Sequence, residues 1–263
     1  DGDFDPSEVF APGSLSFGHG THVDGLVALA APAAQIMPLR VLDAQGQGNA
    51  WVLAEAMLYA VDPDRNPATN DGAQVINMSL GSTNRTELFD AIAQLSACSI
   101  PAPTDPENTF TDPGYNLDRE RCNAFGGAVV IAAAGNDASR RVKQYPAAEG
   151  AYGLLPVTAS NAQRQLAPFA NFGSWVDVAA PGDGITSAMV GGGWAIWSGT
   201  SMAAPLAAGV AALVRAQEPG LSAKDVARRL ERSSAALCGT DDQRQIDAAA
   251  ALRISAPPQI RCP

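Results

Sequence analysis

One serine lies in a sequence context that is typical of a nucleophile, between a turn and a helix. Ser201 lies in residues 199–205 (Gly-Thr-Ser-Met-Ala-Ala-Pro), between a glycine turn and the small, apolar residues 206–215. The apolar run predicts a buried helix whose first turn begins at Ser201, and the N-terminus of a helix favours negative charge. Gly199 permits close approach by another molecule, and Pro205 is tolerated in a first helical turn. Taken alone, the pattern indicates an N-capped core helix, because serine and threonine are common caps.

The only two histidines of the chain, His19 and His22, lie far upstream of Ser201. Residues 23–30 place apolar side chains at helical spacing, so His19 is predicted to open an amphipathic helix. An imidazole is the side chain best able to take the proton of a serine hydroxyl near neutral pH. A core-facing histidine and half of a metal site are the other interpretations. The metal site is disfavoured, since no Cys or Glu follows at the spacing of a zinc motif.

These segments resemble the signatures of one enzyme family. Residues 18–23 (Gly-His-Gly-Thr-His-Val) and 199–205 look like the histidine and serine motifs of the subtilisin-like serine peptidases, and residues 129–136 resemble the strand and turn that carry the family's oxyanion asparagine. The resemblance implies three catalytic residues, Ser201 as nucleophile, His19 as general base and Asn136 as oxyanion donor beside the Ser201 amide. It implies a serine endopeptidase that acts on peptides or proteins and needs no cofactor for its chemistry.

The similarity continues over most of the chain, from about residue 17 to about residue 252. Residues 41–43 resemble a strand, 75–81 a strand along the substrate cleft, 145–147 a segment whose proline is usually cis, 176–182 a strand before the serine motif and 246–248 the closing helix. The implied substrate-binding residues are Ser79, Leu80, Gly81, Ala133, Ala134, Gly135, Gly46 and Gly48. Several of them would pair with an extended peptide as added strands. Gln144 is a candidate for altering the floor of the pocket before the scissile bond.

The third catalytic group of the family has no counterpart in these residues. In the family an aspartate on a strand upstream of the histidine completes the triad. Residues 1–18 hold three aspartates in a Gly-, Pro- and Ser-containing stretch without an apolar run, which predicts a loop. Asp24, where the family usually has alanine, lies five positions after His19 and is rotated away from it on a helix. We therefore assign no catalytic aspartate.

Two explanations for the missing aspartate stay open. A start without Met, signal peptide or first strand favours a chain whose first strand lies outside the given sequence. The alternative is a degenerate relative, a catalytically impaired binding or scaffold module that lacks the triad Asp.

The order of β and α patterns predicts the fold class, and the net charge disfavours some classes of partner. Alternating β and α patterns through residues 36–215 predict one α/β domain, and the resemblance makes it a three-layer sandwich with a mostly parallel central sheet flanked by helices. We expect residues 1–263 to form this single domain without its N-terminal strand, with an inserted surface loop at 99–121 away from the substrate and a C-terminal tail at 253–263. A net charge of −10 disfavours nucleic acid and anionic membranes as partners. No stretch is apolar enough to span a membrane, and a monomer is expected.

Four cysteines, Cys98, Cys122, Cys238 and Cys262, carry a prediction about the compartment. None stands beside Ser201 in sequence, so disulfides are favoured over catalysis or metal binding, and they indicate a secreted or periplasmic protein. Of the three pairings, Cys98 with Cys122 and Cys238 with Cys262 are favoured because each closes a local polar loop. Four reduced thiols in a cytosolic protein are the alternative.

Calcium is a further implication of the resemblance. Asp177 and the carbonyls near residues 147–151 resemble a region that can hold a structural Ca²⁺, but loop acids are usually only solvated. No metal ligand is therefore assigned.

Overall fold

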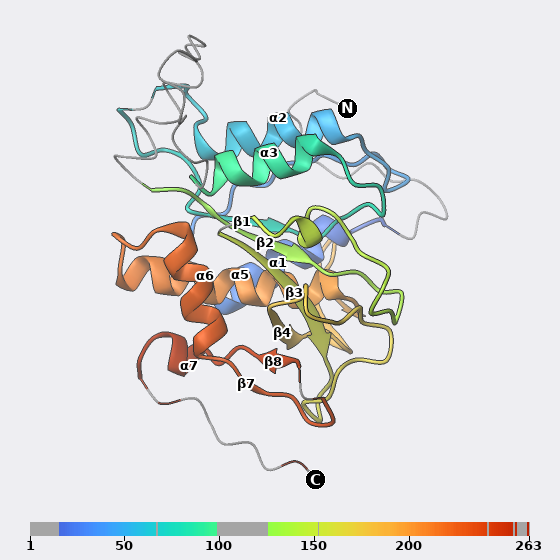
Figure 1. Ribbon diagram of the computed structural model, residues 1–263. Helices are drawn as coiled ribbons and strands as arrows, with labels where there is room; N and C mark the ends of the chain where they lie inside the picture. The colour runs from blue at the N-terminus through green and yellow to red at the C-terminus, as the bar shows by residue number, and fades with distance from the viewer. Residues whose placement is uncertain are drawn as a thin grey trace.

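Helices and strands alternate along the chain, as the sequence predicts (Figure 1). The computed structural model describes residues 16–66, 68–98, 126–151, 153–240, 242–254, 256 and 262. Its helices are α1 (His19–Ala30), α2 (Ala50–Val61), α3 (Glu87–Ser96), the short η1 (Ala147–Glu149), α5 (Thr200–Gln217), α6 (Ala223–Arg232) and α7 (Ala248–Ala251). Its strands are β1 (Val75–Met78), β2 (Val129–Ala133), β3 (Leu154–Ser160), β4 (Val178–Pro181), β5 (Ile185–Ala188), β6 (Trp194–Trp197), β7 (Ala235–Ala236) and β8 (Arg244–Gln245).

The central sheet is mostly parallel. Among the described strands its order is β1-β2-β3-β4-β8-β7, with parallel pairing from β1 to β8 and antiparallel pairing of β7 with β8. The hairpin of β5 and β6 stands apart from this sheet. Parallel strands end at the same edge of a sheet, so the residues that follow β1 and β2 come together at one end of the molecule.

Helices cover both faces of the sheet, with α2 and α3 on one side and α1, α5 and α6 on the other (Figure 1). Alternation along β2 builds both interfaces, because successive strand side chains point to opposite faces. Val129 and Ile131 pack with α5 and α6, whereas Val130 and Ala132 pack with α2 and α3. The predicted three-layer α/β fold is confirmed. In the part of the chain that the structure describes, no helix is both long and apolar enough to cross a membrane.

Two predicted helices start where the motifs place them. α1 begins at His19, and its N-cap Gly18 has a φ of 82° that favours glycine. A Cβ at Gly18 would lie 2.5 Å from the Met189 sulfur, but this is the flexible end of a side chain, so the positive φ is the stronger reason for glycine here. α5 begins at Thr200, one residue before the predicted start at Ser201. Helix ends vary by a residue or two, so this difference is small.

The predicted strand at residues 41–43 is absent from the described structure. A strand needs a hydrogen-bonded neighbour, and β1 is the last strand at this end of the described sheet. Residues 34–44 instead line a cavity between β1 and the helices. The sequence pattern was strand-like, but the partner that would order it is not among the described residues.

The disulfide prediction is confirmed for one pair. Cys238 and Cys262 are bonded, with Cα atoms 5.4 Å apart. Cys98 is also disulfide-bonded, and its predicted partner Cys122 lies outside the described residues. The predicted loop at 99–121, the N-terminal residues 1–15 and most of the C-terminal tail lie outside them as well.

Candidate active site

Ser201 lies in the first turn of α5 and contacts the residue that follows β1. Its Oγ donates to the Ser79 carbonyl oxygen at 3.1 Å, and the Ser79 hydroxyl donates to the Ser201 carbonyl oxygen at 2.8 Å. This reciprocal pair fixes the start of α5 against the carboxyl end of β1. The Ser201 residue is half-buried, so its side chain is not sealed in the core.

Asn136 is held beside the start of α5 by Thr200. The Asn136 Oδ1 accepts from the Thr200 backbone N–H at 2.9 Å and from the Thr200 hydroxyl at 3.1 Å. The Gly135 N–H donates to the same hydroxyl at 3.0 Å. These bonds occupy the carbonyl oxygen of the Asn136 side chain, so its Nδ2 is turned the other way. Within the described ranges nothing accepts a hydrogen bond from that Nδ2.

Two N–H donors flank one point beside Gly199. A methyl group added there would lie 3.4 Å from Asn136 Nδ2 and 3.7 Å from the Ser201 backbone nitrogen. The first amide N–H groups of a helix have no intrahelical partner and favour negative charge. Both nitrogens therefore lie close to one point at the start of α5.

His19 opens α1, which packs directly against α5 through Val23, Leu26 and Met202. The His19 ring stacks on Trp197, four residues before Ser201, with ring centroids 6.1 Å apart. Burial, together with the neighbouring His22, lowers the pKa of His19 below its ordinary value of 6.5. A neutral imidazole at neutral pH can accept a proton. No described hydrogen bond joins His19 to Ser201, whose hydroxyl is turned to Ser79.

His22 has a structural role in this arrangement. It is fully buried and stacks on Trp197 with centroids 4.8 Å apart. Its Nε2 lies 3.2 Å from the Ala195 carbonyl oxygen and donates to it in the tautomer protonated there. His22 therefore fixes the β5–β6 hairpin, and with it Trp197, against α1.

Asn171 organises the loop that carries Asn136, and the sequence analysis missed it. Its buried Nδ2 donates to the Ala134 carbonyl oxygen and to the Asp137 carboxylate, both at 3.0 Å, while its Oδ1 accepts from the Asp137 and Ser139 N–H groups. A single Asn in a loop carries no periodic signal. Only its contacts with a distant loop show that it supports the site.

The residues predicted to bind substrate fall into three segments. Ser79 to Gly81 follow β1, and Ala133 to Gly135 close β2, so both groups lie at the carboxyl end of adjacent parallel strands. Gly46 closes a turn in which its N–H donates to the Asp43 carbonyl oxygen. Gly46, Ser79 and Leu80 line the same cavity. The Tyr145–Pro146 bond is cis, as the resemblance implies.

Gln144 lies between two of these segments. A Cβ on Gly135 would lie 2.4 Å from Gln144 Cγ, and one on Gly81 would lie 3.2 Å from Gln144 Oε1. Gln144 Nε2 donates to the Asp137 carboxylate at 3.3 Å. The side chain therefore lies beside Gly81 and Gly135, which follow β1 and β2.

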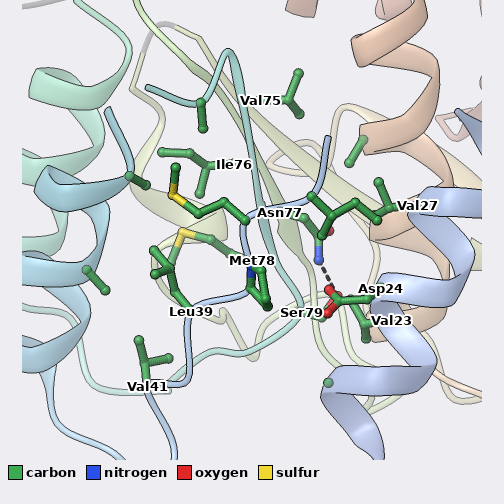
Figure 2. A pocket seen from close by; sticks show the side chains of 18 of the residues that line it. Val23, Asp24, Val27, Leu39, Val41, Val75, Ile76, Asn77, Met78 and Ser79 are labelled. Atoms are coloured by element: carbon green, nitrogen blue, oxygen red, sulfur yellow. Dashed lines mark hydrogen bonds between the residues drawn. The ribbon is translucent and has the colours of Figure 1, made fainter. Parts of the chain in front are cut away.

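A large cavity lies beside β1. Its volume is about 1220 Å³, above the range of roughly 300–1,000 Å³ that is usual for small-molecule sites. Figure 2 shows apolar side chains around it from α1, from β1 and from Leu39 and Val41. Ile36, Met37 and Leu39 are 38%, 38% and 37% exposed, which is high for apolar residues of a core layer. One end of the cavity reaches His19.

The lining also includes polar and charged side chains, two arginines among them. Asp24 on α1 points toward Asn77 and Ser79 (Figure 2). No described residue donates a hydrogen bond to Asp24, and burial raises its pKa above the ordinary 3.8. Asn77 Nδ2 donates to the Ser79 hydroxyl at 3.0 Å, but its buried Oδ1 has no partner among the described residues.

We assign no metal site to the acidic residues. Within the described residues, Asp62, Asp64 and Asp71 form the one group of three acids with ligand atoms within 4.8 Å of one another. Asp177, in the region predicted to hold calcium, is not part of it. Asp64 accepts from the Thr69 hydroxyl and Asp71 accepts from the Asp64 N–H. These carboxylates stabilise a turn, and clustering of acids alone does not identify a cation site.

Comparisons with known proteins find similar sequences over most of this chain. The sequence model of the subtilase family matches residues 8–250. A thermophilic serine proteinase of Bacillus sp. (strain AK1) is 33% identical over 250 residues, which cover 91% of this chain and 51% of that protein. Thermitase of Thermoactinomyces vulgaris is 33% identical over 234 residues, 85% of this chain and 69% of that protein.

The fold is similar to solved structures as well. The crystal structure of a cold adapted subtilisin-like serine proteinase matches with a TM-score of 0.69 and 27% identity, over 90% of this chain and 76% of that one. A protease from Pseudoalteromonas arctica matches with a TM-score of 0.71 and 28% identity, over 90% and 70%. The chain spans about half the length of several curated relatives that it matches.

Proposed function

Because the chain belongs to the subtilase family, we propose that it is a serine endopeptidase with Ser201 as nucleophile, His19 as general base and Asn136 as oxyanion donor. The observation that supports the proposal is the Thr200 anchor, which holds Asn136 beside the start of α5, where its Nδ2 and the Ser201 nitrogen both lie near one point beside Gly199. A helix cap alone would not require this second donor from a distant strand.

In the proposed mechanism each of these residues has a separate role. His19 takes the Ser201 hydroxyl proton as Oγ attacks the peptide carbonyl, and the carbonyl oxygen becomes an oxyanion that accepts from Asn136 and the Ser201 amide. The tetrahedral intermediate collapses when His19 gives its proton to the leaving amine. Water then attacks the acyl-Ser201 ester with His19 again as base. Ser201 must first rotate from Ser79 toward His19, since its hydroxyl now donates to the Ser79 carbonyl.

A third group is needed to orient His19, and we propose that a strand in the β1 cavity supplies it. Both His19 and Ser79, the residue after β1, line this cavity. A strand parallel to β1 would end at the same edge of the sheet as β1, so a carboxylate after it would face the His19 ring. Such a carboxylate would hold the imidazole tautomer and stabilise the imidazolium.

Hydrolysis of a peptide anilide tests the proposed activity. We expect cleavage by the chain that is lost in Ser201→Ala, with a simple ester cleaved by the same residue. Cleavage of the ester without any anilide or protein cleavage would indicate an esterase instead. The disulfide Cys238–Cys262 supports a secreted or periplasmic setting for this activity.

A second candidate function rests on the state of His19. Among the described residues no carboxylate pairs with the His19 ring. The Ser201 hydroxyl donates to the Ser79 carbonyl oxygen and not to His19. A binding or scaffold module would have this arrangement permanently. The two functions separate in one assay: the module would bind a peptide unchanged, whereas the peptidase would cleave it.

The pH dependence of Ser201 reactivity should reflect the lowered pKa of His19. Only neutral imidazole accepts the serine proton, so the rate of phosphonate inactivation is expected to rise with pH through a midpoint below 6.5. The measurement is the inactivation rate constant of this chain from pH 4 to 9. A midpoint above 6.5 would contradict it, since a nearby carboxylate would then already be raising the pKa of His19.

Gln144→Gly is expected to widen the pocket between the ends of β1 and β2. Removing this side chain from between Gly135 and Gly81 should raise kcat/KM for Phe over Ala before the scissile bond by roughly 10- to 100-fold. Gln144→Glu, which has the same size, is the matched control and should not change this ratio in the same direction. The measurement is a series of peptide anilides that differ only at that residue.

A further inference from the structure

An ion pair joins the loop after β1 to the segment that follows Pro146. Arg85 Nε donates to Glu149 Oε2 at 3.0 Å. The two partners differ in their surroundings, since the Arg85 side chain is 61% exposed and the Glu149 side chain has no exposed surface. The second carboxylate oxygen, Glu149 Oε1, is buried and has no hydrogen-bond partner among the described residues. Arg85 is therefore the described partner of a carboxylate that water does not reach.

A buried carboxylate with this one partner is not the most stable way to fill the space. Taking a charge out of water is costly, and a neutral side chain of similar volume is often as stable or more stable. What a buried ion pair can add is one fixed geometry, because it ties two segments together at defined atoms. The pair is therefore best explained by what it holds in place.

The ion pair lies beside a contact between the two segments that flank the substrate pocket. Ser82 and Tyr145 form an antiparallel bridge, in which the Ser82 N–H donates to the Tyr145 carbonyl oxygen at 3.0 Å and the Tyr145 N–H donates to the Ser82 carbonyl oxygen at 2.8 Å. Arg85 lies three residues after Ser82, and Glu149 lies four residues after Tyr145. The bridge and the ion pair thus link the same two segments in succession.

Gln144 connects this link to the pocket. It directly precedes Tyr145, and its side chain lies beside Gly81 and Gly135. A Cβ on Gly81 would also lie 3.4 Å from the Tyr145 carbonyl oxygen, so the backbones of the two segments are close here. A shift of residues 144–149 relative to the loop after β1 would therefore move Gln144 relative to Gly81.

The two ends of the ion pair differ in how firmly they are held. Ala147, in the same short helix η1 as Glu149, is 1% exposed and belongs to the apolar cluster that includes Phe89 of α3 and Leu154 of β3. Residues 83–85, by contrast, are exposed and belong to no helix or strand. Arg85 thus ties an exposed loop to a segment that is anchored in the core.

We propose that the Arg85–Glu149 pair sets the width of the pocket before the scissile bond, by holding the loop after β1 against residues 144–149. The effect on substrate choice rests on the proposed function, whereas the effect on the Ser82–Tyr145 bridge does not. Both charged residues act through Gln144 and are positioning residues, not catalytic ones.

Glu149→Gln tests the charge, because it keeps the volume and an acceptor oxygen. Water can solvate the exposed Arg85 in this variant, so we expect a melting temperature equal to or above that of the wild type. Hydrogen exchange of the Ser82 and Tyr145 amides should still become at least about 5-fold faster. In the anilide series, kcat/KM for Phe over Ala before the scissile bond should rise by about 3- to 10-fold.

Arg85→Met separates stability from positioning. It leaves the buried Glu149 carboxylate without its partner, so the melting temperature should fall. Adding Glu149→Gln should restore the melting temperature, while the amide exchange and the Phe over Ala ratio should stay changed. In a Gln144→Gly background the ratio should shift by less than about 2-fold on either substitution, since the side chain through which the pair acts is gone.

Glu218→Gln is the matched control, because Glu218 pairs with Arg229 beside the end of α5 opposite to Ser201. It should leave the amide exchange and the ratio unchanged. The proposal is overturned if exchange of the Ser82 and Tyr145 amides is unchanged in Glu149→Gln, if it is faster without any change in the ratio, or if the double variant regains the wild-type ratio with its melting temperature. If the wild type cleaves no anilide, the proposed function fails, and amide exchange alone decides whether the pair holds the bridge.

Discussion

Supplying a strand that ends in aspartate is expected to raise kcat/KM for a peptide anilide by about 10⁴-fold over the same strand ending in asparagine. The reason is the His19 ring, which has no carboxylate partner among the described residues. Asparagine fills the same volume but leaves the imidazole without the negative charge that stabilises its protonated form. The measurement is anilide hydrolysis by the chain saturated with each peptide.

The two peptides must first be shown to bind equally, so that the difference reports on His19 alone. The midpoint pH at which the hydrolysis rate falls on acidification should also be higher with the aspartate peptide, because a nearby carboxylate raises the pKa of an imidazole. Equal binding with equal turnover would contradict the assignment of the third group to this strand.

Asn136→Ala is expected to lower kcat by about 10²- to 10³-fold with little change in KM. Asn136 Nδ2 and the Ser201 N–H flank the point beside Gly199, and their bonds to an oxyanion form only in the transition state. Asn136 is exposed, but its Oδ1 also accepts from the buried Thr200, so this variant loses the anchor as well as the donor. The measurement is steady-state hydrolysis of the peptide anilide by the strand-complemented protein.

Asn136→Asp separates the donor from the anchor. Its carboxylate can still accept from the Thr200 N–H and hydroxyl, so the loop stays in place. It has no N–H to offer and adds a negative charge, so its kcat should fall at least as far as that of Asn136→Ala. An Asp variant close to the wild type would show that Asn136 only holds the loop.

The local motifs were predictable because short sequence patterns encode them. Apolar spacing gave α1 and α5 within a residue of their observed starts, and the buried run of β2 predicted the strand that carries Asn136. The position of each catalytic candidate relative to its own helix or strand follows from such patterns. Parallel pairing of β1 with β2 brings the segments that carry Ser79 and Asn136 to the same edge of the sheet.

The features that escaped prediction depend on contacts between distant segments. Residues 41–43 have a strand-like pattern, but a strand forms only against a partner, and β1 has none on that side in the described structure. Asn171 supports the Asn136 loop through backbone contacts that no spacing reveals. The helical spacing predicts that Asp24 is rotated away from His19, but only the folded chain shows that it lines a cavity beside β1.

Labelling with a fluorophosphonate tests the central claim most directly, since the claim is that His19 activates Ser201 for attack. With the aspartate-ending strand bound, we expect a single adduct that mass spectrometry maps to Ser201, that is absent in Ser201→Ala and that forms at least about 10²-fold more slowly in His19→Ala. No adduct at Ser201 in the strand-complemented protein, or the same rate of labelling in His19→Ala, would contradict the account.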